Sequence, residues 1–193
     1  YNTSLGMAAG FAITTGSFNT AVGWAAQCCH TTGQNNTSVG FQAGGYTGGA
    51  NNNTSIGTNA ATCGSGGQNT FLGAGTGNLN ATGSYNVFLG YTTGCCVTTG
   101  SCNVIVGGYS GSAIATSTGQ IVLSDGIGTN RLQIDNNGYV FVNTTTCIGS
   151  QPSQLNLYGY NAGGGAGYHQ FLSVQNTCGT ATNPKKFFRM NST

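Results

Sequence analysis

The chain has 193 residues, of which four are Lys or Arg and two are Asp or Glu, giving a formal net charge of +2. So little charge cannot neutralise phosphates, which excludes a nucleic-acid partner. No apolar run approaches the ~18 residues of a membrane-spanning helix, so no membrane insertion is expected. Because an average domain is about one quarter charged, solubility must come from Asn, Thr, Ser, Gln and exposed backbone.

A short motif, Asn-Thr/Val-x-aliphatic-Gly, recurs along the first part of the chain. Its copies are NTSLG, NTAVG, NTSVG, NTSIG, NTFLG, NVFLG and NVIVG, which begin at residues 2, 19, 36, 53, 69, 86 and 103. Successive copies therefore start 16 or 17 residues apart. A unit of this length is too short for a pair of helices but suits one turn of a β-solenoid with two short strands per turn. Stacked turns would lie ~4.8 Å apart.

Several positions of the repeat keep one kind of side chain, counting the Asn as the first. The fourth is a large aliphatic residue, expected to form the core ladder inside the coil. Its members are Leu5, Val22, Val39, Ile56, Leu72, Leu89 and Val106. The fifth is a glycine that turns a corner through positive φ or close backbone approach. These corner glycines are Gly6, Gly23, Gly40, Gly57, Gly73, Gly90 and Gly107. The eighth is small, and we expect the first-position Asn amides to bond between turns.

A single coil of this kind is thin. Ordering one turn costs roughly 17–34 kcal/mol of backbone entropy, whereas a large buried aliphatic side chain contributes about 1.5–3 kcal/mol. Further apolar residues are expected to need a partner surface to pack on: Met7, Trp24, Phe41, Phe71, Phe88, Tyr91 and Ile105. Lateral association of identical coils provides one, and we expect it to close with cyclic symmetry as a homotrimer.

The segment NTAVGWAA, followed by TTGQNNTSVGFQAG, resembles the repeats of phage and algal-virus tail fibres, many of which end in an endosialidase-type self-cleaving chaperone. It is also similar to the head of trimeric autotransporter adhesins. The resemblance covers residues 1–110 and implies a left-handed parallel β-roll assembled as a trimer. No chaperone sequence is present, and the fibre is expected to continue before Tyr1.

After residue 110 the period is expected to stop. IVLSDG at 121–126, RLQIDNNG at 131–138 and YVFVN at 139–143 predict three short strands. Asp125-Gly126 and Asn137-Gly138 are hairpin turn signals. The run IVLSDGIGTNRLQIDNNGYVFVN resembles the connector that follows such repeats in tail fibres. We therefore divide the chain into a solenoid (1–110), a β connector (111–150) and a distal β segment (151–193).

Candidate catalytic groups are few, and we expect no enzymatic activity. Glycosidase chemistry needs two carboxylates about 5–10 Å apart, but the only acids, Asp125 and Asp135, lie at turn positions where Asp is common.

A thiol-catalysis site or a metal site could be suggested by three neighbouring residues, Cys28, Cys29 and His30. Adjacent residues of an extended chain point to opposite faces, which argues against a Cys–His dyad. Cys95 and Cys96 occupy the same repeat positions, so structural thiols are favoured, with disulfides and a metal site left as alternatives. No metal or cofactor is expected.

Aromatic faces beside neutral amides suit glycans, which makes the distal aromatic residues candidates for receptor binding. They are Tyr158, Tyr160, Tyr168 and His169. Packing between chains is the favoured alternative for the same residues. Taken together, the sequence predicts an extracellular, trimeric segment of a virion tail fibre that binds other fibre proteins and a host cell-surface glycan or protein receptor. A bacterial trimeric adhesin head and a purely structural surface filament are the alternatives.

Overall fold

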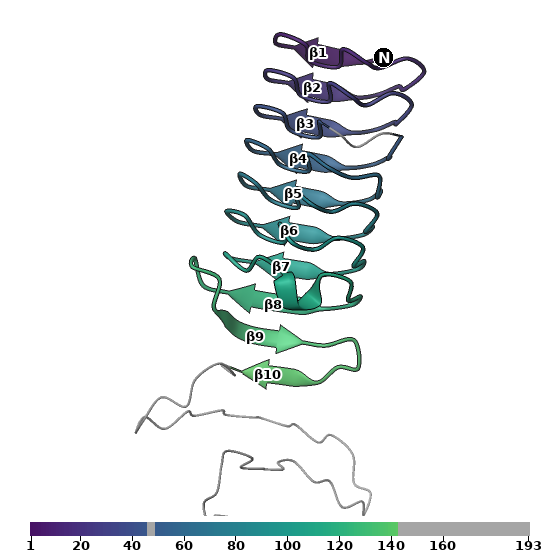
Figure 1. Ribbon diagram of the computed structural model, residues 1–193. Helices are drawn as coiled ribbons and strands as arrows, with labels where there is room; N and C mark the ends of the chain where they lie inside the picture. The colour runs from purple at the N-terminus through teal and green to yellow at the C-terminus, as the bar shows by residue number, and fades with distance from the viewer. Residues whose placement is uncertain (46–48, 143–193) are drawn as a thin grey trace, which may run out of the picture. The chain divides into compact units, whose positions relative to one another are not determined.

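The computed structural model describes residues 1–45 and 49–142, which form a stack of similar coils built from strands and turns (Figure 1). The strands are β1 (Thr3–Leu5), β2 (Thr20–Val22), β3 (Thr37–Val39), β4 (Thr54–Ile56), β5 (Thr70–Leu72), β6 (Val87–Leu89), β7 (Val104–Val106), β8 (Ile121–Ser124), β9 (Asn130–Ile134) and β10 (Val140–Val142). One short 3-10 helix, η1, spans Ser112–Ile114. The expected all-β, parallel β-solenoid with turns of about 17 residues is confirmed.

All strands belong to one sheet in chain order, so each coil pairs with the next. β1 to β8 are parallel, whereas β9 and β10 add antiparallel strands as a meander. The parallel stack thus extends one strand beyond residue 110, where the period was expected to stop. Gln120 takes the place of the repeat Asn and Ser124 that of the corner glycine. The left-handed sense of the coil and the homotrimer remain predictions.

Each turn contains one strand and not the two that were expected. The opposite wall instead places alternate residues in the left-handed region, as at Ala25 (φ 52°) and Gln27 (φ 51°), which no extended strand allows. Its backbone still bonds to neighbouring turns: Ala25 N donates to Met7 O (2.9 Å) and Gln27 N to Ala43 O (3.0 Å). This wall is therefore a stack of hydrogen-bonded turns.

The first-position Asn side chains form a ladder along the inside of the coil. Asn86 shows the pattern: Oδ1 accepts from Asn103 N (3.0 Å), and Nδ2 donates to Gly100 O (2.9 Å), near the end of the same turn. Its own N–H donates to Asn69 Oδ1 (2.8 Å). The same backbone-to-amide bond joins Asn2 to Asn19, Asn19 to Asn36, Asn36 to Asn53, Asn53 to Asn69 and Asn103 to Gln120. The expected bonds between turns are confirmed, and the amides make them mainly with backbone groups of the neighbouring turn.

The ladder fixes which side chains enter the coil. Side chains alternate across a strand, so an inward first position sends the third inward and the second and fourth outward. The third position is Ser4, Ala21, Ser38, Ser55, Phe71, Phe88 and Ile105, and all but Ser4 are buried. The expectation that the fourth-position ladder lies inside is therefore wrong. Leu5, Val22, Val39, Ile56, Leu72, Leu89 and Val106 stay in register from turn to turn, but they are exposed or only half-buried.

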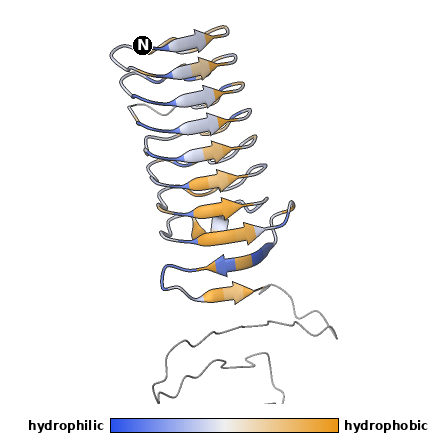
Figure 2. Cartoon of the chain, turned by 180° about the vertical axis from the view of Figure 1, so that it is seen from behind, coloured by the Kyte–Doolittle hydropathy of each residue, from blue (hydrophilic) through white to orange (hydrophobic). Residues whose placement is uncertain are grey.

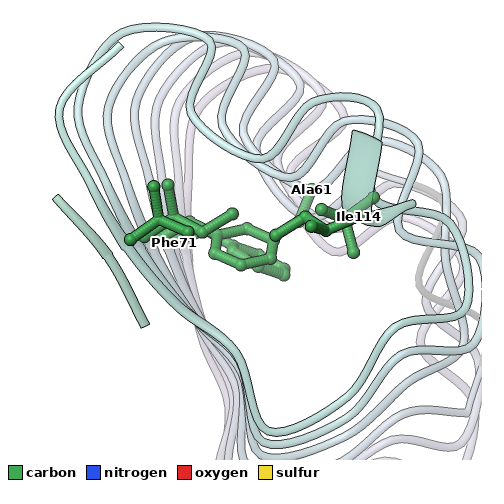
Figure 3. Packing of buried hydrophobic residues seen from close by; sticks show 7 residues of the cluster. Ala61, Phe71 and Ile114 are labelled. Carbon is green, nitrogen blue, oxygen red and sulfur yellow. The ribbon is translucent and has the colours of Figure 1, made fainter. Parts of the chain in front are cut away.

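Residue sizes are matched across the narrow interior. Where the third position is Ala21, the facing ninth position is Gln27, whose Nε2 donates to Ser38 Oγ (3.0 Å). Where the third position is Phe71, the ninth is Gly77, and a Cβ there would lie 2.7 Å from the Phe71 ring. Figure 3 shows Phe71 reaching from the strand wall across the coil toward Ala61 and Ile114. The core is thus polar or small in the first turns and apolar in the later ones.

The corner glycines have φ between 115° and 138°, a region that only Gly adopts without large strain. They also pack backbone against backbone: a Cβ on Gly57 would lie 2.5 Å from Gly73 O. The left-handed positions elsewhere, with φ near 50–60°, hold Ala, Gln, Asn and Thr as well as Gly. This difference explains why only the corner is Gly in every copy.

Removing one rung of the Asn ladder should destabilise the coil. Asn53→Ala would leave Asn69 N–H and Gly66 C=O without their partners, at a cost of about 1–3 kcal/mol for each buried group. Asn52→Gly is the matched control, because Asn52 is exposed, has φ 60° and bonds to Gln34 O through its backbone N–H. Chemical denaturation should show a loss for Asn53→Ala and little change for Asn52→Gly. Equal midpoints would contradict the ladder's role.

A corner substitution should be far less tolerated than one two residues later. In Gly73→Ala the new Cβ would meet Gly90 O at φ 138°. In Gly75→Ala it would lie 3.3 Å from a Thr92 methyl group, at a position that other turns fill with Ala. We expect soluble folded protein from Gly75→Ala only, measured by far-UV circular dichroism and thermal melting. Native melting of Gly73→Ala would refute the corner geometry.

Candidate functional site: the outer strand face

The most extensive unpartnered feature of the coil is the surface formed by the second- and fourth-position side chains of β1 to β8, called here the outer strand face. Its fourth position is aliphatic throughout, ending with Leu123 in β8. Leu5 is 67% exposed, Leu72 43% and Leu89 42%. Because these residues are in register, they form one continuous apolar stripe along the stack.

The second position changes character along the same face. It is Thr in β1 to β5 and then Val87, Val104 and Ile121. Figure 2 shows the consequence, with β6, β7 and β8 more hydrophobic than the strands before them. No Asp, Glu, Lys or Arg occurs before Asp125. The face can therefore be covered without desolvating any charge.

The stripe continues onto the antiparallel strands. Leu123 pairs with Leu132 and Ile121 with Ile134 across β8 and β9, and Ile134 pairs in turn with Val140 of β10. Paired residues of an antiparallel sheet lie on the same side. The apolar surface thus runs the full ten-stranded length of the sheet.

Aromatic residues lie near the corners. Trp24 and Phe41, both directly after a corner glycine, stack with ring centroids 4.8 Å apart. Tyr1 and Phe18, which precede the repeat Asn, stack at 5.3 Å. All four rings are exposed despite stacking. Trp24 and Phe41 are among the residues for which the sequence predicted a partner surface. Phe71, Phe88 and Ile105 were expected to need such a surface too, but they are buried inside the coil because the third position points inward.

The two acids occupy equivalent tight turns. Asp125 Oδ1 accepts from the N–H groups of Ile127 (3.2 Å) and Thr129 (2.9 Å), and Asp135 Oδ1 accepts from those of Asn137 and Tyr139, both at 2.9 Å. In each of these tight turns, the fourth residue counted from the Asp is a glycine with positive φ. In the first turn this is Gly128, not the Gly126 that the sequence suggested.

These contacts make the acids structural groups. The pKa of Asp125 is lowered, first because the Thr129 N–H donates to it and further by Arg131, whose Nη2 lies 2.7 Å from Oδ2. The length of β9 separates Asp125 from Asp135 by roughly 15 Å, beyond the span of a glycosidase pair. The two carboxylates are not brought together.

His30 is completely buried and lies against the Asn ladder. Asn36 Nδ2 is 3.0 Å from His30 Nε2 and can donate to it only while that nitrogen carries no proton. Burial lowers the pKa of His30. Asn80 fills the same twelfth position in a later turn, so His30 serves as an interior polar residue.

The cysteine loops differ from what an extended chain would give. Cys28 Sγ lies 3.4 Å from Cys29 Sγ, and Cys95 Sγ lies 3.6 Å from Cys96 Sγ. The neighbouring thiols converge because both pairs lie in turns. Within the described ranges, no group of three or more His, Cys, Asp or Glu could hold a metal ion. The candidate receptor residues Tyr158, Tyr160, Tyr168 and His169 lie outside the described residues.

Sequence reasoning missed the outer strand face because it assigned the aliphatic ladder to the core. The missed signal was the alternation of side chains along a strand: if the Asn points inward, the residue three positions later must point outward.

No family model, curated protein or solved structure matches the chain. Among residues 1–45 and 49–142, no helix has the length and hydropathy needed to span a membrane.

Stability should decrease as the pH falls below about 6.5, the model-peptide pKa of histidine. Because the pKa of His30 is lower in the folded chain, the unfolded chain binds the proton first as the pH falls. The free energy of unfolding therefore has its full value above about pH 6.5 and decreases as the pH is lowered from there toward the pKa of the folded state. His30→Asn, which copies Asn80, should flatten the profile between pH 7 and 5 in denaturant titrations. His169→Asn removes the other histidine and should leave the slope unchanged. A slope that follows His169 instead would refute the assignment.

Proposed function

We propose that this chain is a segment of a trimeric extracellular fibre, of the virion tail-fibre kind, that spaces and presents a host-receptor-binding surface. The observation that carries the proposal is the outer strand face, an apolar stripe too long and too regular for a lone soluble coil. Exposed apolar patches of this extent are typical of interaction sites. Three left-handed coils, each turning this face toward a common axis, would cover it.

The composition of the coil supports association with copies of itself. The surface consists of Leu, Val, Ile and Thr, and no Asp, Glu, Lys or Arg occurs before residue 125. It therefore has no charges that could select a different protein partner by electrostatic complementarity. In-register ladders on identical coils can meet along their whole length, and closed symmetry stops growth at a fixed number of chains. The meander that β9 and β10 add to β8 would then act as the connector to the distal segment.

A passive role fits the chemistry of the described residues. Asp125 and Asp135 are engaged by backbone N–H groups, and His30 is buried. General acid–base catalysis needs a titratable group beside a substrate proton, so we propose binding without catalysis. Receptor binding by the distal aromatic residues would be weak per site and strengthened by three copies.

A bacterial adhesin head and a structural surface filament remain alternative assignments of the same architecture. The flanking parts of the full-length gene distinguish them. A virion-anchoring domain or a self-cleaving chaperone would support the viral fibre. A C-terminal membrane anchor of the autotransporter kind would support the adhesin instead.

The proposal predicts that a charge on the outer strand face dissociates the assembly without unfolding the coil. The unmodified chain should have a trimeric mass by light scattering, nearly independent of salt because there are few charges to screen. Val39→Asp should give a folded monomer, since Val39 is already 36% exposed within one chain but would meet another chain in the trimer.

Thr82→Asp places the same charge on an exposed loop and should remain trimeric. A monomeric mass for the unmodified chain would refute the trimer. A trimeric Val39→Asp variant would show that another surface makes the contact.

A further inference from the structure

Two pairs of adjacent cysteines occupy the tenth and eleventh positions of their turns. Cys28 and Cys29 lie in the second turn, and Cys95 and Cys96 in the sixth. The sulfur atoms of each pair are 3.4 and 3.6 Å apart, against about 2.05 Å in a disulfide. The two pairs have nearly the same geometry although they are far apart in the stack.

The backbone of the solenoid holds each pair in place. Cys28 N donates to Ala25 O (3.3 Å) and Cys29 N to Gly45 O in the next turn (3.1 Å). In the other pair, Cys95 N donates to Thr92 O (3.2 Å) and Cys96 N to Ser110 O (2.8 Å). Each dithiol therefore sits in a turn whose conformation is fixed independently of the sulfur atoms.

The spacing of the stack excludes bonds among these loops within one chain. Cys29, Cys63 and Cys96 share the eleventh position, and each is two turns from the next, which places neighbouring members of this column roughly 10 Å apart at their Cα atoms. A disulfide cannot join Cα atoms more than about 7 Å apart. For Cys29 and Cys96, the thiol within reach in this column of loops is the adjacent one.

We propose that Cys28–Cys29 and Cys95–Cys96 are two vicinal dithiol sites that exchange with a low-molecular-weight disulfide, such as oxidised glutathione, and close reversibly into vicinal disulfides. The Cys29 thiolate attacks one glutathione sulfur, forming a mixed disulfide and releasing one reduced glutathione. Cys28 then attacks Cys29 Sγ, closing the ring and releasing the second. The two cysteines lose two electrons and two protons, which the two glutathione thiols gain.

The same geometry makes such a bond easy to reduce. The peptide bond between the two cysteines is trans, so their Cα atoms are about 3.8 Å apart, below the usual 4.4–6.8 Å of disulfides. Strained disulfides have higher reduction potentials. Burial, and secondarily the neighbouring thiol, raise the pKa of Cys28 and of Cys95 to about 11, so ring closure should accelerate as the pH rises.

Cys63 provides a matched control within the chain. It occupies the same column as Cys29 but follows Thr62 instead of a second thiol. Its N–H donates to Asn78 O (3.2 Å), the bond in the next turn that corresponds to Cys29 N with Gly45 O. Cys63 can therefore form the mixed disulfide but has no neighbour to displace the glutathione.

The test is peptide mapping of the folded, reduced chain after incubation with oxidised glutathione and blocking with N-ethylmaleimide. Chymotryptic cleavage after Trp24 and Phe41 isolates the first pair, and cleavage after Tyr46 and Phe71 isolates Cys63. We expect the Cys28–Cys29 peptide to be lighter by two hydrogen atoms and unlabelled, while Cys63 retains glutathione. Reduced glutathione should reverse the closure. A Cys102→Ser background gives the same measurement for Cys95–Cys96.

In the Cys28→Ser variant, Cys29 should retain glutathione as Cys63 does. The proposal is overturned if both cysteines of a pair keep glutathione or the maleimide label. It is equally overturned if either is joined to a different cysteine, in the same chain or another, on a non-reducing map.

Discussion

The fold depends on one repeated interaction, the bond from a first-position Asn to the backbone of its own and the next turn. A thin coil has many backbone groups facing its interior, and buried polar groups without a hydrogen-bond partner are costly. The Asn amide satisfies two of them at once: Asn69 Oδ1 accepts from Asn86 N, and Nδ2 donates to Gly83 O. The ladder joins neighbouring turns and closes each turn on itself.

Once Asn points inward, alternation decides the rest of the strand. The third position must fit inside a coil one side chain wide, which is why Phe88 faces Gly94 and Ala21 faces Gln27. The fourth position is left outside, where Leu and Val have no contact partner in the same coil that would bury them. An apolar face that the coil cannot cover itself is the physical basis for proposing an assembly and a structural role.

The loops are where the chain departs from a uniform stack, because they lie outside the ladder's constraint. They carry the dithiol pairs and the acids of the tight turns, and Asp125 is placed by backbone contacts beside Arg131. Neighbouring sulfur atoms converge only because the local backbone turns. A function of the loops can therefore differ from that of the strands.

By itself the sequence determined the period, the parallel stacking, the corner glycines and the strands of residues 121–142, because each depends on local spacing or on a backbone angle that one residue type satisfies. It did not determine which face of the strand is inside. An aliphatic residue at the fourth position of every copy is typical of a core. Only the tertiary structure showed that the Asn side chains point into the coil, so that alternation along the strand places Leu89 outside. The single strand per turn, β8 as an eighth rung and the convergence of Cys28 with Cys29 were likewise decided by how whole turns stack, since hydrogen bonds between residues about 17 positions apart fix their conformation.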